Sequence, residues 1–155
     1  SEYYKLRGFL GKSVPRVRFP EAKRNMQSLV EAIDLGYVKA CHDLSEGGLA
    51  VAAAEMAFSG GYGMELHLAN VVRSSSLQRD DFILFSESNS RFLVEVKKKH
   101  REDFEELMRG INFSLVGKVT KNRHLTVYGL KGEVVLDAGI WELLESWKGT
   151  FGEAL

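Results

Sequence analysis

Several features that would narrow the function of a protein are scarce or missing in this chain. Its 155 residues include one cysteine, Cys41, which excludes a disulfide framework within the chain and agrees with a reducing compartment. The 21 basic residues are balanced by 21 acidic ones, so the chain lacks the basic excess that marks partners of nucleic acid or acidic membranes. No apolar run approaches the roughly 20 residues of a membrane span, and residues 1–5 lack the apolar core of a signal peptide. We therefore expect a cytoplasmic protein that acts on a small molecule or another protein, with neither nucleic acid nor membrane as partner.

The composition that remains is that of one globular domain. Hydrophobic residues make up 45% of the chain and charged residues 27%, and the length is sufficient to bury a core. The chain begins with serine rather than methionine, which suggests a processed or excised chain.

The first 20 residues are predicted to be a connecting arm, and residues 21–155 the folded domain. Residues 1–19 show little helical periodicity and are interrupted by glycine and proline. The simplest interpretation is a solvated linker, with packing along another domain as the alternative. Five basic side chains are spread along the arm: Lys5, Arg7, Lys12, Arg16 and Arg18.

Hydrophobic spacing beyond the arm predicts four helices. The first begins after Pro20 and ends at Gly36, and the second, residues 48–58, is apolar on nearly every side and must be covered by packing. The faces expected to be apolar are Ala22, Met26, Leu29, Val30 and Ile33 in the first helix, Phe104, Leu107, Met108 and Ile111 in the third, and Trp141, Leu144 and Trp147 in the last.

Strands are predicted between these helices, and their order with the helices indicates an α/β or α+β domain with a mixed sheet. The predicted strands are residues 38–42, 63–68, 82–85, 92–96, 113–119, 124–130 and 133–136.

The most informative segment, residues 42–48, reads His-Asp-Leu-Ser-Glu-Gly-Gly at the junction between a predicted strand and the apolar helix. One interpretation is a simple helix start, in which Ser45 caps free amides and the glycines permit close packing. The alternative is a ligand site, in which Ser45, Gly47 and Gly48 hold a phosphate at the unsatisfied amides. Because Asp43 and Glu46 would repel a bare phosphate, that alternative predicts Mg²⁺ between these carboxylates and a bound nucleotide, ATP or ADP.

Strand alternation places Cys41 and Asp43 on one face and His42 on the other, so a Cys41–His42 nucleophilic dyad is not expected. We expect Cys41 to be a buried thiol. The other three histidines are scattered along the chain without metal-ligand spacing, and zinc is not predicted.

A second polar segment, residues 86–91, lies between two predicted apolar strands. Its serines and asparagine suit a hairpin connection. Alternatively, Glu87, Ser88 and Arg91 bring an acceptor, a hydroxyl and a guanidinium into one loop that could contact substrate.

Two stretches carry a resemblance to a known family. The segments HDLSEGGLAVAAAEMAFSGGYGMEL (residues 42–66) and ILFSESNSRFLVEV (residues 83–96) resemble the C-terminal domain of the large synthetase subunit of phosphoribosylformylglycinamidine synthase, and the opening SEYYKLRG resembles the stretch that precedes it. The resemblance implies a three-layer α/β/α domain with a mixed sheet and partly ferredoxin-like topology, as in the aminoimidazole ribonucleotide synthetase-like superfamily.

The family makes formylglycinamidine ribonucleotide, ADP and phosphate from formylglycinamide ribonucleotide, ATP and glutamine-derived ammonia. By position, the resemblance assigns Mg²⁺ binding to Asp43 and nucleotide contact to Ser45, and it matches Gly47 and Gly48. It also implies three protein partners: the N-terminal ATP-binding half of the same enzyme, a glutaminase subunit and a small bridging subunit. The family's catalytic histidine lies in the half that is missing here, so the chain alone is not expected to catalyse.

Two other functions fit the sequence. The chain could be a non-catalytic domain whose motif caps a helix and whose apolar surfaces pack against sister domains. It could also be the same domain of a different ATP-dependent synthetase or kinase of the superfamily.

Overall fold

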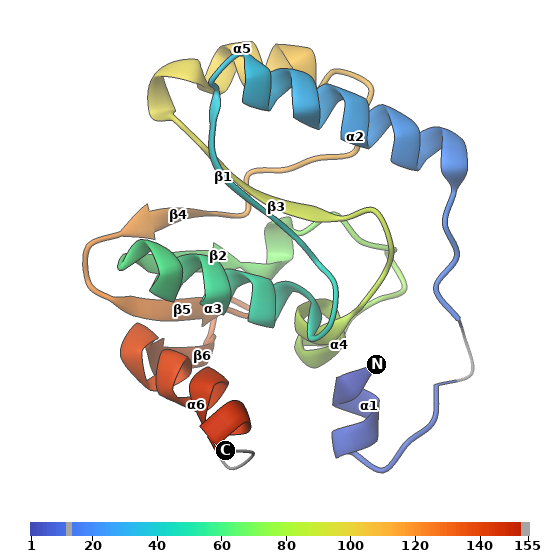
Figure 1. Cartoon of the computed structure of the whole chain (residues 1–155). Helices are drawn as coiled ribbons and strands as arrows, with labels where there is room; N and C mark the ends of the chain where they lie inside the picture. Colours follow the sequence, from blue (N-terminus) through green and yellow to red (C-terminus); the bar gives the residue numbers. More distant parts are fainter. Residues whose placement is uncertain (12–13, 153–155) are drawn as a thin grey trace.

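The computed structural model describes residues 1–11 and 14–152, which fold into helices and strands that alternate along most of the chain (Figure 1). The helices are α1 (Glu2–Leu6), α2 (Phe19–Asp34), α3 (Gly48–Gly60), α4 (Asp80–Phe85), α5 (Arg101–Leu107) and α6 (Ile140–Gly152), with two short 3₁₀ turns, η1 (Leu68–Asn70) and η2 (Lys98–His100). The strands are β1 (Val38–Asp43), β2 (Gly63–His67), β3 (Phe92–Val96), β4 (Gly117–Thr120), β5 (His124–Tyr128) and β6 (Val134–Gly139).

The strands form two sheets. β1 and β3 make an antiparallel ribbon, while the second sheet has four strands in the order β4-β2-β5-β6. Within it β2 and β5 are parallel and the other pairs antiparallel, which confirms the mixed sheet. The unit β1-α3-β2 is repeated as β3-α5-β4, with β1 paired to β3 and β2 to β4, an arrangement of the split βαβ kind. The expected mixed α/β class is confirmed.

The larger core lies around α3, which packs against β1, β2, α4 and α6. Figure 1 shows α3 lying across the four-stranded sheet, with α6 beside it. This enclosure explains why the helix sequence has almost no polar face. The largest fully buried side chains include Leu66, Leu68, Ile83, Leu125 and Val127.

The smaller core lies between α2, α5 and the β1–β3 ribbon, where Ala32, Phe104 and Met108 are buried. α2 begins and ends within two residues of its predicted bounds. Its apolar face, however, is wider than the part of the helix that packs against the rest of the domain. Ala22 and Leu29 are buried, whereas the remaining members of the predicted face, Met26, Val30 and Ile33, are exposed.

Three sequence predictions about elements are wrong. Residues 82–85 belong to helix α4, because a short apolar run has no diagnostic period and Asp80 and Asp81 favour a helix start. β4 begins at Gly117 and not at residue 113. Residues 2–6 of the arm form helix α1, which is too short to show periodicity in the sequence.

Helix α1 is held against α4 by aromatic contacts. The Tyr3 ring stacks on Phe85 at 4.8 Å, and Tyr4 meets Phe82 edge-on at 5.7 Å.

Of the five basic arm residues, Lys12 lies outside the described residues. Across the described ranges, no helix combines the length and the apolarity needed to cross a membrane.

Candidate functional site

The fold brings the predicted motif and the predicted loop together, although they are about 40 residues apart in the chain. Both border a hollow of about 680 Å³ at the end of the β1–β3 ribbon. The lining residues that the sequence singled out are Asp43, Ser45 and Glu46 from the motif, and Glu87 and Arg91 from the loop.

The glycine pair sets the path of the chain from β1 into α3. Gly47 and Gly48 have φ values of 75° and 64°, in the left-handed region that favours glycine. A Cβ atom on Gly48 would lie 2.5 Å from the carbonyl oxygen of Ser86 and 2.9 Å from that of Leu84. The pair therefore allows the start of α3 to pack directly on the end of α4, as the helix-start interpretation expected.

The backbone amides at this turn already have acceptors. Gly47 N–H donates to Glu87 Oε1 at 3.1 Å, and Gly48 N–H donates to the carbonyl of Ser45 at 3.1 Å. The Glu87 carboxylate also accepts from Glu2 N–H at 3.0 Å, so it connects α1, the loop and α3. A phosphate on the Gly47 amide would have to displace Glu87. The predicted roles of Gly47 and Gly48 in holding a ligand stay predictions.

Ser45 does not act as the helix cap. In the described chain, the N-cap residue of α3 is Gly47, and no side-chain hydrogen bond is made from that position. Ser45 is exposed at the rim of the hollow, where its hydroxyl can be reached by a ligand.

The two carboxylates predicted to bind metal are both accessible. The Asp43 side chain is 63% exposed, and Glu46 is exposed beside it on the lining of the hollow. Among residues 1–11 and 14–152, no three His, Cys, Asp or Glu side chains are grouped closely enough to hold a metal by themselves. Mg²⁺ is usually held by one or two carboxylates with phosphate oxygens and water completing its shell. Asp43 and Glu46 fit that partial role.

Strand alternation at the end of β1 is as predicted. Cys41 and Asp43 are exposed on one face, and His42 turns to the other, where its Nε2 lies 2.7 Å from Glu55 Oε2. The other oxygen of Glu55 accepts from Trp147 Nε1 at 3.0 Å, so the polar contacts run from β1 through α3 to α6. No Cys41–His42 dyad can form across the strand.

The expectation that Cys41 is a buried thiol is wrong, because the face that it shares with Asp43 opens into the hollow and not into a core. The thiol is nevertheless partly shielded from water. This desolvation, with a smaller contribution from the negative charge of Asp43, raises the pKa of the Cys41 thiol.

In the loop, the three predicted residues face different ways. Arg91 is half-buried and closes the loop on itself, because its Nη1 donates to the Ser86 carbonyl at 3.3 Å; desolvation lowers the pKa of its guanidinium. Glu87 points to the start of α3. Ser88 is exposed, and its hydroxyl lies 2.9 Å from that of Ser86.

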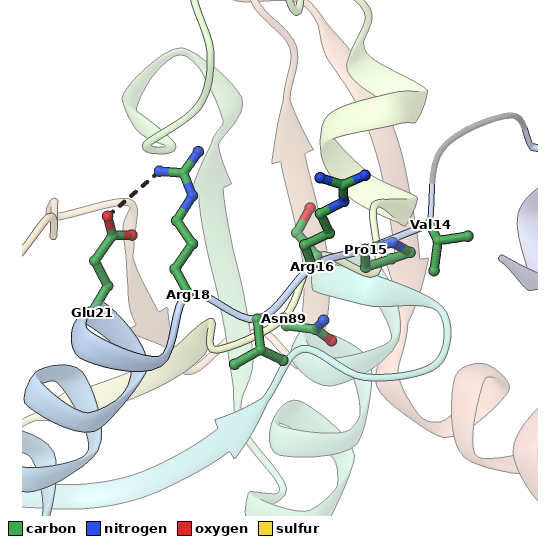
Figure 2. A pocket seen from close by; sticks show the side chains of 8 residues that line it. Val14, Pro15, Arg16, Arg18, Glu21 and Asn89 are labelled. Carbon is green, nitrogen blue, oxygen red and sulfur yellow. Dashed lines mark hydrogen bonds and ion pairs between the residues drawn. The ribbon is translucent and has the colours of Figure 1, made fainter.

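A second hollow, of about 650 Å³, lies between the arm and the loop (Figure 2). The arm forms one wall with residues 14–18, and Ser88 and Asn89 form the opposite wall. Asn89 borders both hollows. The sequence did not single out Asn89, and it did not assign Arg16 and Arg18 to a site. The signal that could have indicated the two arginines is their i, i+2 spacing in a segment without helical periodicity.

Comparison with known proteins identifies the family of the chain. The family model described as AIR synthase related protein, C-terminal domain, matches residues 2–129. The chain belongs to this family. A curated member, the phosphoribosylformylglycinamidine synthase subunit PurL of Thermococcus sibiricus (strain DSM 12597 / MM 739), is 37% identical over 121 residues, which are 78% of this chain and 16% of that protein. The chain therefore spans about a sixth of the length of this relative.

Several solved structures share the fold of this chain. PurL of Thermotoga maritima complexed with FGAR superposes with a TM-score of 0.71 at 24% identity, over 79% of this chain and 20% of that one. Other structures of that protein are complexed with ATP or ADP, and one is of PurLQS. HypE of E. coli, a hydrogenase maturation protein, has a TM-score of 0.61 at 22% identity, over 84% of this chain and 42% of that one. At these identities the structures support the fold alone.

Proposed function

We propose that this chain is the C-terminal domain of a phosphoribosylformylglycinamidine synthase, the ATP-dependent ligase that converts formylglycinamide ribonucleotide and glutamine-derived ammonia to formylglycinamidine ribonucleotide. The observation that carries the proposal is the 37% identity to a PurL subunit over 78% of the chain. Residues 1–20 would then be the connecting arm and residues 21–155 the domain, which helps to form a nucleotide or substrate site and is not catalytic alone.

The accessible groups suggest how the domain would bind its ligand. Asp43 and Glu46 are placed to share Mg²⁺ with the phosphates of ATP or ADP, and the Ser45 hydroxyl is available to a phosphate oxygen. The bound metal would neutralise phosphate charge, while Gly47 and Gly48 fix the turn. On the loop side, Arg91 holds the loop in shape, and Ser88, which lines the second hollow, is exposed to substrate.

The partners follow from the same assignment. They are the N-terminal ATP-binding half of the enzyme, a glutaminase subunit and a small bridging subunit, and a solved structure of PurLQS from a relative supports this set. We infer a cytoplasmic location because the reaction belongs to purine biosynthesis.

The metal role is tested by Asp43→Asn in the full-length enzyme that contains this domain. Removing the carboxylate charge should reduce Mg²⁺-dependent nucleotide retention by about tenfold or more, because one of two carboxylate ligands is lost. Titration with Mg-ADP, with and without chelator, measures the effect.

Asp103→Asn is the matched control, because Asp103 has a similarly exposed side chain (58%) on α5, away from the hollow. Unchanged nucleotide content and unchanged stability in Asp43→Asn would remove the metal role. Turnover with formylglycinamide ribonucleotide, ATP and ammonia tests the reaction itself.

Two further functions have support of their own. The exposed face of α2, with Met26, Val30 and Ile33 each 45–56% accessible, favours a packing domain whose motif only shapes a turn. The fold likeness to HypE favours the same domain in another ATP-dependent synthetase or kinase. Specific Mg-ADP binding that Asp43→Asn abolishes would count against the first. Turnover with other formamide or phosphate-acceptor substrates would identify the second.

A further inference from the structure

We propose that Arg16 and Arg18 of the arm form a metal-independent subsite for an oxyanion, the phosphate monoester of the ligand bound by this domain. The subsite is the second hollow, which lies between the arm and residues Ser88 and Asn89 of the loop (Figure 2). The proposal rests on the proposed function for the identification of the ligand as a ribonucleotide. Oxyanion binding itself is measurable without that assumption.

The first step of the argument is the conformation of the arm. Residues 14–18 have no helical structure, and Arg18 is extended, with φ −94° and ψ 91°. In an extended segment the side chains at positions i and i+2 leave on the same side. Figure 2 shows the Arg16 and Arg18 side chains leaving the arm in the same direction. Both guanidinium groups are thus presented on the same side of the arm.

The second step is charge. The only ion pair in the lining joins Arg18 Nη1 to Glu21 Oε1 at 3.5 Å, and within the described ranges Arg16 has no hydrogen-bond or ion-pair partner. The lining therefore carries one net positive charge. The first hollow is lined by Asp43, Glu46, Glu87 and a single cation, Arg91, so its net charge is negative.

Because their linings differ in net charge, the two hollows accept different ligand groups. A bare oxyanion is attracted to the arm side and repelled from the motif side, where a cation is needed first. Because Asn89 borders both hollows, one ligand could contact both. A guanidinium group can donate two parallel hydrogen bonds to the oxygens of one phosphate. The Asn89 amide and the Ser88 hydroxyl supply further donors. This chemistry selects a phosphate monoester.

The experiment is a titration of the chain with inorganic phosphate and with ribose 5-phosphate, in chelator and at low ionic strength, followed by calorimetry or by the ³¹P signal. We expect Arg16→Ala/Arg18→Ala to weaken both affinities at least tenfold. The double substitution Arg16→Lys/Arg18→Lys should cause an intermediate loss of affinity. Lysine keeps the positive charge but cannot make the two parallel hydrogen bonds of a guanidinium. Tighter binding of ribose 5-phosphate than of phosphate would point to the ester as the natural ligand group.

Arg101→Ala/Arg109→Ala is the matched control: it removes two exposed arginines of the α5 region, each paired with a glutamate, and the affinity should not change. An equal loss in this control would reduce the effect to general charge attraction and overturn the proposal. No phosphate binding by the unaltered chain, or the same affinity in Arg16→Ala/Arg18→Ala, would also overturn it. Asp43→Asn separates the two hypotheses, because it should weaken Mg²⁺-dependent nucleotide binding and leave phosphate binding in chelator intact.

Discussion

At the scale of single residues, Gly48 carries the strictest requirement at the candidate site. Its positive φ disfavours any side chain, and a Cβ would overlap two backbone oxygens at the end of α4. We expect Gly48→Ala to lower the free energy of unfolding by about 3 kcal/mol, because the strain and the overlap both act on backbone that cannot rotate away. Urea denaturation measures the change.

Gly132→Ala is the control for that substitution. Gly132 also has a positive φ, 88°, but no described heavy atom lies within 4 Å of the position that a Cβ would occupy. It should therefore show only the conformational cost, about 1 kcal/mol. If both substitutions cost the same, close packing of α3 on α4 is not what requires glycine at position 48.

At the scale of elements, α1 is joined to α4 by a charged contact as well as by stacked rings. Asp81 Oδ2 accepts from the Tyr3 hydroxyl at 2.6 Å and from Arg79 Nη2 at 2.7 Å. The hydrogen bond from Arg79, with a smaller contribution from Tyr3, lowers the pKa of Asp81 from 3.8 to about 2. The folded chain therefore favours the ionised carboxylate more strongly than the unfolded chain does.

The sign of the pH dependence follows from this lowered pKa. The contribution of Asp81 is fully present above pH 3.8 and is lost as the pH falls toward about 2. We expect Asp81→Asn to flatten the dependence of stability on pH over that interval, and Tyr3→Phe to do so in part. Urea midpoints between pH 2 and 6 test this. The same slope in all three proteins would mean that this contact does not lower the pKa of Asp81 in the folded chain.

At the scale of the whole molecule, the chain has two cores of unequal size joined by the β1–β3 ribbon. The larger surrounds α3, β2 and β5, and the smaller has, among the described residues, three buried members, Ala32, Phe104 and Met108. Local opening costs least where few apolar contacts are lost. We expect the amides of α5 to exchange with solvent before those of α3 and β5, as measured by native-state hydrogen exchange.

Equal protection of α5 and β5 would contradict that expectation and would mean that the ribbon couples the cores into one cooperative unit. The first hollow lies at the end of the ribbon beside the loop, and the second lies between the arm and the loop. The shape of both therefore depends on the loop, and that of the second hollow also depends on the arm.

Much of the local structure could be predicted from the sequence because it depends on neighbouring residues. The motif at residues 42–48 was sufficient to place a strand end, a glycine turn and a helix start, and the apolar sequence of α3 predicted its enclosure. Alternation in β1 correctly put Cys41 and Asp43 on the face opposite His42. The family resemblance lay in the same short segments and agrees with the match over residues 2–129.

Only the tertiary structure decided which distant groups meet. The apolar run at residues 82–85 has no period of its own and lies in helix α4, which packs on α3, and Cys41 is exposed because its face borders a hollow. Glu87 supplies the acceptor for Gly47, 40 residues earlier, in place of the Ser45 cap that local chemistry favoured. The sequence by itself determined the family, the glycine turn and the carboxylates of the motif, because these depend on residue type and near neighbours. Tertiary structure alone decided that Glu87 accepts from the amide at the start of α3 and that the arm lines the second hollow. Both are contacts between residues far apart in the sequence, which depend on the folded path of the chain.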